Sequence, residues 1–277
     1  MEHLQRLKFE SPSFGKRLKG MLGVDFYRLF HTPMYYIFLA IAALIPALIL
    51  GTGGMTNPQT GEVGAMLYTN VWNAVAADTP LYVVSSIGEY ANMNMVFIFG
   101  GIMVSIFIGN DYRSGYVKQL FTTHALKQDY MMSKTLVSAF SMACMCVTYL
   151  IGSVAAGALV GLDFSVNVGS LVCAVIGKLI MSLGWASLYT FLNVIFRKFF
   201  GVSIASSFFF GTGILIIGAA AILGNSSILN IFLYGSSVYA CLSSNILTVL
   251  VCLVCSAAWT VIYTVAGTRV LNTCDVY

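Results

Sequence analysis

Residues 199–268 read FFGVSIASSFFFGTGILIIGAAAILGNSSILNIFLYGSSVYACLSSNILTVLVCLVCSAAWTVIYTVAGT and contain no Asp, Glu, Lys, Arg or His. Of the 277 residues in the whole chain, 58% are hydrophobic and 9% are charged, whereas roughly 25% are charged in an ordinary soluble domain. A water-soluble fold of this length could not cover its surface with so few charges. The composition therefore predicts an integral membrane protein, in which lipid is the solvent for the long apolar runs.

Six apolar segments are long enough to cross a bilayer, for which a helix needs about 20 mainly apolar residues. We expect spans at Met34–Leu50, Tyr90–Gly109, Thr135–Gly161, Leu171–Phe196, Phe199–Leu223 and Ile246–Gly267. The runs are continuous and lack the alternation of a lipid-facing strand, which favours helices over a barrel. The predicted fold is an all-α integral membrane protein with a single transmembrane domain over residues 1–277. The apolar part of residues 224–245 is too short to span, and we interpret this segment as interfacial or re-entrant.

The positions of the basic residues predict the orientation. Six of the 14 Lys and Arg residues precede the first span, four lie between spans two and three, two between spans four and five, and one follows span six. With six spans, all these segments face the same side, which the positive-inside rule identifies as the cytoplasm. Both ends are therefore expected in the cytoplasm, with the chain crossing the cell membrane several times. Lys178 is the exception, either a functional charge inside span four or, as we favour, a lysine that snorkels to the outer interface.

The stretch before span one, Phe14–Phe30, has the pattern of an amphipathic interfacial helix. Leu18, Leu22 and Leu29 recur at spacings typical of one helical face, although Asp25 interrupts the apolar stripe. The net charge of +4 is consistent with contact to anionic membrane lipid rather than nucleic acid, because the basic residues are spread over separate loops. An ordinary basic flank that only fixes orientation explains the stretch equally well.

The loop between spans two and three carries the most informative pattern. Gly115 can bend the chain, and Tyr116–Phe121 is expected to form a short helix that presents Tyr116, Leu120 and Phe121. Thr122 or Thr123 is the expected N-cap of the next helix. Two helices that meet at a bend beneath the bilayer would pass motion between a soluble partner and the spans. The residues alone slightly favour the alternative, a loop whose charges only fix the topology.

Two motifs resemble a known family. Asp111-Tyr112-Arg113-Ser114-Gly115-x-Val117-Lys118, followed by Tyr130-x-x-Ser133-Lys134, resembles the loop between spans two and three of ABC-2 type transporter permeases. The segment Asp25–Pro33 resembles the amphipathic lead-in of the same family. The sequence departs from the family pattern at Asp111, where Glu is usual, and at Tyr116, where Thr is usual. The number of spans, the orientation and the large first outer loop also fit.

The resemblance implies a permease subunit of an ABC transporter that pairs with a second permease subunit, identical or different. Two separate ATPase subunits would bind ATP and Mg and dock on the loop. The implied ATPase-coupling residues are Asp111, Tyr112, Arg113, Gly115, Tyr116, Lys118, Leu120 and Phe121. The chain itself contains no G-x-x-x-x-G-K-[ST] motif, so we expect no cofactor in it.

The cargo is expected to be amphipathic or hydrophobic, such as a peptide, an antimicrobial peptide or a drug, because few polar groups lie in the spans. The resemblance favours export, in the context of peptide secretion or self-protection against peptide antibiotics. It also suggests that the span-five hydroxyls line the translocation path, and these belong to Ser203, Ser206, Ser207 and Thr212. Packing between helices is the competing explanation for these hydroxyls.

Two other classes of function remain to be weighed. An intramembrane enzyme would need a metal site or a nucleophile with a base, but His3, His31 and His124 all lie outside the predicted spans. We therefore expect neither catalysis nor a metal site. The main alternative to the permease is a stand-alone immunity protein that sequesters a peptide in the membrane without an ATPase.

Overall fold

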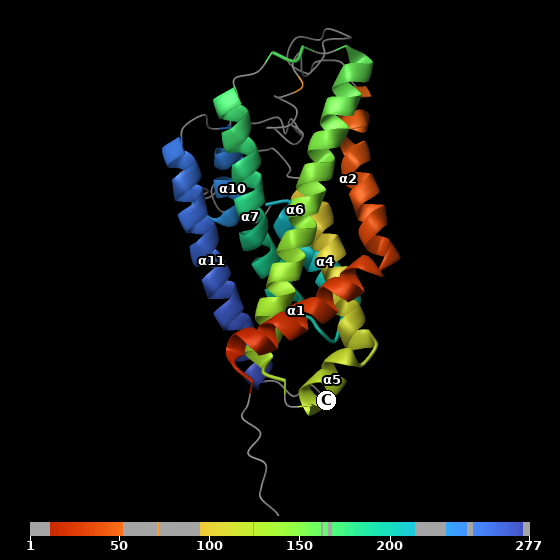
Figure 1. Cartoon of the computed structure of the whole chain (residues 1–277), viewed down its shortest axis with the longest axis vertical. Helices are drawn as coiled ribbons and strands as arrows, with labels where there is room; N and C mark the ends of the chain where they lie inside the picture. The colour runs from red at the N-terminus through yellow and green to blue at the C-terminus, as the bar shows by residue number, and fades with distance from the viewer. Residues whose placement is uncertain are drawn as a thin grey trace, which may run out of the picture.

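The computed structural model describes residues 12–51, 71, 95–123, 125–161, 163–165, 168–213, 231–242 and 246–273. These residues form helices and no strand. The helices are α1 (Phe14–Phe30), α2 (Pro33–Gly51), α4 (Met95–Arg113), α5 (Tyr116–Thr122), α6 (Lys127–Val160), α7 (Val168–Ile195), α8 (Phe200–Gly211), α10 (Leu233–Leu242) and α11 (Ile246–Thr273). The long helices run side by side, and α1 and α5 lie together at one end of the bundle (Figure 1). We call this the α5 end.

Within the described ranges, four single helices are long and apolar enough to cross a membrane, namely α4, α6, α7 and α11. The helices α1 and α2 together form a fifth candidate, bent by 67° where they join. The bend lies at Pro33, the first residue of α2, where the missing proline N–H is not needed by the helix. The described part of the chain therefore fits a multi-pass membrane protein with four or five crossings.

The predicted spans one, two, three, four and six overlap α2, α4, α6, α7 and α11, although residues 90–94 of span two lie outside the described ranges. The predicted fifth span, Phe199–Leu223, is described only in its first part, where α8 covers 12 residues. Its remaining residues 214–223 lie outside the described ranges, as do most of the predicted outer loop 51–88 and His124. A count of six spans and the cytoplasmic position of both ends stay predictions.

The segment predicted as interfacial or re-entrant contains a helix, α10, which packs against both α7 and α11. Two polar residues of this helix, Ser236 and Ser237, are buried. The hydroxyl of Ser237 donates to the carbonyl of Leu233 (2.6 Å) and accepts a hydrogen bond from the indole N–H of Trp185 on α7 (2.7 Å). A serine whose hydroxyl is satisfied in this way is compatible with an apolar, buried helix.

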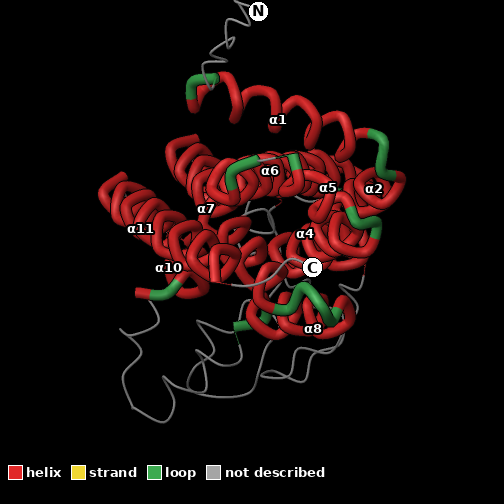
Figure 2. Tube along the Cα trace, turned by 90° about the horizontal axis from the view of Figure 1, so that it is seen from below, coloured by secondary structure: helices red, strands yellow, loops and turns green. Residues whose placement is uncertain are grey.

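The helix α6 forms the centre of the bundle, where it packs against α1, α2, α4, α7 and α11. The view from below shows α1 along the outside of α6 and α8 on the opposite side of the bundle (Figure 2). Close approach depends on small residues, since a Cβ added at Gly101 of α4 would lie 2.6 Å from Cζ of Tyr189 on α7. This packing fixes α1, α4 and α6 next to one another at the α5 end.

Candidate functional site

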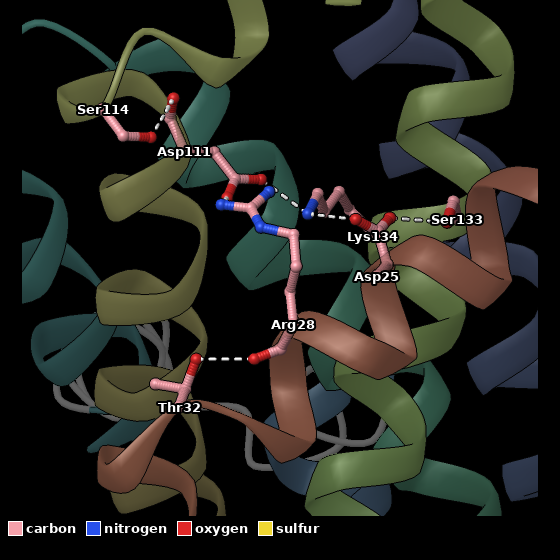
Figure 3. A network of polar contacts seen from close by, with 7 residues as sticks. All are labelled: Asp25, Arg28, Thr32, Asp111, Ser114, Ser133 and Lys134. Carbon is pink, nitrogen blue, oxygen red and sulfur yellow. Dashed lines mark hydrogen bonds and ion pairs between the residues drawn. The ribbon is translucent and has the colours of Figure 1, made fainter.

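Four charged side chains meet where α1, α4 and α6 join (Figure 3). Asp25 and Arg28 come from α1, Asp111 from the last turn of α4 and Lys134 from α6. The ammonium of Lys134 lies 2.7 Å from Oδ1 of Asp25 and 2.5 Å from Oδ2 of Asp111. The guanidinium of Arg28 lies 2.6 Å from Oδ1 of Asp111. We call these four residues the charge cluster.

The charge cluster is almost completely removed from solvent. Asp25, Asp111 and Lys134 are 0% exposed, and only the Arg28 side chain, at 27%, is partly accessible. The two acids and the two bases leave no net charge, which is the condition under which buried ions are tolerated. The second carboxylate oxygen of Asp25 accepts a hydrogen bond from Ser133 Oγ at 2.6 Å. The cluster therefore ties three helices together through buried ion pairs.

Aromatic rings surround the two cations of the cluster. The Lys134 ammonium lies 4.5 Å from the ring centroid of Phe107, and at 5.7 Å and 5.6 Å from those of Tyr116 and Tyr130. The guanidinium of Arg28 lies 3.9 Å from the centroid of Tyr116, a favourable cation–π distance. Burial, with Asp25 nearby, raises the pKa of Tyr116, so its phenol stays neutral at physiological pH.

The short helix predicted after Gly115 is confirmed as α5. Gly115 has φ +73° and precedes its first residue, a conformation that glycine adopts without steric cost. The expectation that Thr122 or Thr123 caps α6 is wrong. Their hydroxyls donate instead to the carbonyls of Gln119 and Leu120, each at 2.7 Å, at the end of α5, and α6 begins later, after Leu126.

The inner face of α5 packs into a hydrophobic cluster centred on Val117, which is buried. We call this cluster the hydrophobic plug. Val117 packs with a cluster drawn from α6, α7 and α11, whose buried members are Tyr130, Met131, Val194 and Leu271. Leu120 and Phe121 are half-buried against the same cluster, and the Phe121 ring meets that of Tyr130 edge-on at 5.6 Å. Val117 therefore connects α5 to three long helices.

Of the sequence-predicted coupling residues, only Arg113 and Lys118 are exposed. Tyr116, Leu120 and Phe121 were expected to face outward, but the structure places them against the chain's own helices. Asp111 is buried in the charge cluster, and Tyr112 is half-buried beside it. Ser114 and Gln119, which were not among the predicted residues, are exposed beside Arg113 and Lys118. A partner that approached α5 would meet these polar side chains first.

The hydroxyls predicted to line a path in span five lie in hydrogen bonds within the chain. The hydroxyls of Ser207 on α8 and Ser105 on α4 lie 2.7 Å apart. Asn193 on α7 donates to Ser105 Oγ at 3.0 Å and accepts a hydrogen bond from Ser203. This polar cluster joins α4, α7 and α8.

The other two predicted hydroxyls bond within their own helix. Ser206 donates to the carbonyl of Ser203 (2.9 Å), and Thr212 to that of Phe209 (2.8 Å). Packing between and within helices accounts for all four hydroxyls in this conformation, and a role in translocation stays a prediction.

Lys178 is buried within the helix bundle. It is 5% exposed, and its ammonium lies 5.1 Å from the ring centroid of Tyr149 on α6. The helix α7 begins at Val168, about 15 Å before Lys178 at 1.5 Å per residue. A snorkelling lysine extends its ammonium to the interface, whereas this ammonium is buried against an aromatic ring between helices, which argues against snorkelling.

The sequence did not reveal the pairing inside the charge cluster. The sequence pattern marks Asp25 only as an interruption of the apolar stripe before span one, and Lys134 only as a basic loop residue within the motif that resembles ABC-2 permeases. The spacing of Asp25 and Arg28 was the available signal, since an acid and a base three residues apart beside an apolar face can turn inward together. In the described part of the chain, no group of His, Cys, Asp and Glu side chains is arranged to hold a metal ion.

Searches for similar proteins add no identification, since no protein-family model and no curated protein matches this chain.

Proposed function

We propose that this chain is the permease subunit of an ABC transporter, with six spans and both ends in the cytoplasm of a cell whose plasma membrane it crosses. Two ATPase subunits bind ATP and Mg and dock against α5, and a second permease subunit completes the transporter. The cargo is an amphipathic or hydrophobic molecule, such as a peptide or a drug, and is exported. The observation that carries this proposal is the double attachment of α5 to the bundle.

The first attachment is the charge cluster at the start of α5. Arg28 contacts both Asp111, which precedes the bend at Gly115, and the ring of Tyr116, which follows it. The bend is therefore held from both sides by one residue of α1. A force applied to α5 reaches α1 and α4 without first unfolding the loop.

The second attachment is the hydrophobic plug at Val117. It connects α5 to Met131 on α6, Val194 on α7 and Leu271 on α11. The start of α6 is also fixed to the end of α11, because Lys127 donates to the carbonyl of Leu271 at 2.6 Å. A loop that only fixed topology would not need this anchoring, whereas a helix that transmits force would.

The exposed face of α5 allows a test that leaves both attachments intact. The experiment is gentle purification of the full chain from its native membrane, followed by mass spectrometry of the proteins recovered in equal amount. A double variant, Lys118→Glu with Gln119→Glu, introduces two negative charges in place of the positive charge of Lys118 on the exposed face. Lys198→Glu is the matched control, because Lys198 is an exposed lysine in the turn between α7 and α8.

Recovery of a P-loop ATPase with the unaltered chain and with the control, and its loss with the double variant, is the expected result. All three chains should insert in the membrane in equal amount. If no ATPase is recovered, even after crosslinking through residues 113–119, the stand-alone sequestration protein becomes the better explanation. If the ATPase is recovered equally with the double variant, α5 is not its docking site.

A further inference from the structure

The basic residues of α1 are used in two different ways. Arg17 and Arg28 turn toward the bundle, where Arg17 Nε lies 2.8 Å from Oδ2 of Asp129 and Arg28 pairs with Asp111. Lys16 and Lys19 are exposed, and among the described residues neither has a charged partner. Two positive charges therefore remain on the side of α1 that faces away from α6.

The outward side of α1 is exposed in the described part of the chain, and its Tyr27 ring stacks on that of His31 at 3.9 Å. At about 100° per residue, Lys16, Gly20, Gly23 and Tyr27 fall on one face, opposite the buried residues Asp25 and Leu29. A Cβ added at Gly20 or Gly23 would meet no atom within 4 Å. No packing against the described residues accounts for these glycines, and they leave the helix surface open between the lysines and the tyrosine.

The same side of α1 carries exposed aromatic residues next to the bend into α2. Tyr27 is 64% and Phe30 42% exposed, and Tyr36 at the start of α2 is also exposed, with its hydroxyl donating to the carbonyl of Phe30 at 2.9 Å. Lysines beside tyrosines are typical of the level at which lipid headgroups lie. The 67° bend turns α1 away from the direction of the apolar helix α2, so its outward face runs along the flank of the bundle.

We propose that the outward face of α1, formed by Lys16, Lys19, Gly20, Gly23 and Tyr27, is a binding surface for the headgroup of an anionic phospholipid. The two ammonium groups pair with the phosphate, the glycines allow the headgroup to approach the helix, and the Tyr27 ring packs against the glycerol and upper acyl region. Because α1 is locked to α4 and α6 by the charge cluster, lipid bound here acts on the element that holds α5. This inference does not depend on the proposed transport function.

The test uses the full chain in detergent and counts bound phosphatidylglycerol by native mass spectrometry, with phosphatidylcholine as the neutral comparison. The double variant Lys16→Gln with Lys19→Gln should bind phosphatidylglycerol about 30-fold more weakly at low ionic strength, with no change for phosphatidylcholine. Lys198→Gln, which removes an exposed lysine elsewhere, should bind both lipids as the unaltered chain does. Because both α1 lysines are exposed, the melting temperature of the double variant should not change.

Three results would overturn the proposal. One is an unchanged affinity of the double variant for phosphatidylglycerol. Another is an equal loss with Lys198→Gln, which would show that only net charge matters. The third is a photoactivatable phosphatidylglycerol that crosslinks outside residues 12–36. Crosslinking within those residues, suppressed by 0.5 M salt as expected from charge screening at about a 4 Å Debye length, would support it.

Discussion

Replacement of Lys134 by methionine tests the central role of the charge cluster. Methionine keeps an unbranched, flexible side chain of similar length but removes the ammonium that lies 2.7 Å from Asp25 and 2.5 Å from Asp111. Both carboxylates remain buried, with Arg28 as the one cation left in the cluster. Removal of one partner from a buried ion pair costs about 3–5 kcal/mol, so Lys134→Met should lower the free energy of unfolding by that amount.

A second substitution separates the lost charge from the lost packing. Asp25→Asn in the Lys134→Met background makes the cluster neutral again, with Asp111 still paired to Arg28. The asparagine carbonyl can still accept the hydrogen bond that Ser133 donates. The double variant should recover at least about 2 kcal/mol relative to Lys134→Met, because apolar or neutral replacement of a whole buried pair is often close to neutral.

The assay is reversible unfolding of the purified chain by titration with sodium dodecyl sulfate in mixed micelles, followed by circular dichroism. Lys198→Met is the control for loss of an exposed lysine and should stay within about 0.5 kcal/mol of the unaltered chain. The reasoning fails if Lys134→Met is as stable as this control. It also fails if the double variant is no more stable than Lys134→Met, since the loss would then come from packing and not from uncompensated charge.

Three further substitutions follow from local geometry, each measured by the same unfolding titration. Gly115→Ala should lower the free energy of unfolding by about 1–2 kcal/mol, because φ is +73° and a left-handed conformation strains alanine. Gly115→Asn should lower it less, and equal losses of stability would contradict this account. Gly101→Ala should destabilise the chain because the new Cβ would lie 2.6 Å from Tyr189. Gly23→Ala, at an open helical position, should instead stabilise the chain by about 0.5–1 kcal/mol. Stability changes of the same sign in the two variants would refute this explanation. Asn193→Leu removes two hydrogen bonds to buried serines and should cost about 1–3 kcal/mol at about 0.6–1.7 kcal/mol each, so an unchanged stability would mean that these bonds contribute nothing.

The long helices were predictable because hydrophobic length is a local property of the sequence. The first predicted span, Met34–Leu50, differs from α2 (Pro33–Gly51) by one residue at each end. Burial in lipid or protein and the closure of backbone hydrogen bonds both favour a helix over such a run. No information from distant residues is needed for this step.

The ends of the helices near the charge cluster were predicted less well, for a specific reason. The sequence was read as if a charged residue ends a span, so span two was expected to stop at Gly109 and span three to start at Thr135. The helices continue through the charges, since α4 extends to Arg113 and α6 begins at Lys127. Partners that are distant in the sequence neutralise Asp111 and Lys134, and a local pattern cannot show such pairs.

The position of the threonines near the end of α5 illustrates a second limit. A threonine hydroxyl can cap the start of the next helix or donate to the carbonyl three residues earlier. The residue type is compatible with both, and the choice at Thr122 and Thr123 depends on where α6 begins. That start is set by Tyr130 and Met131, which must reach the plug around Val117.

The charge cluster also limits how the α5 end can move. Hydrophobic contacts tolerate sliding of one helix past another, whereas ion pairs at 2.5–2.7 Å do not. A shift that separated Lys134 from Asp111 would leave a buried charge without compensation and cost several kcal/mol. Any conformational change in this part of the molecule is therefore expected to move α1, α4 and α6 together. A motion that starts at α5 would then shift these three helices relative to the helices outside the charge cluster.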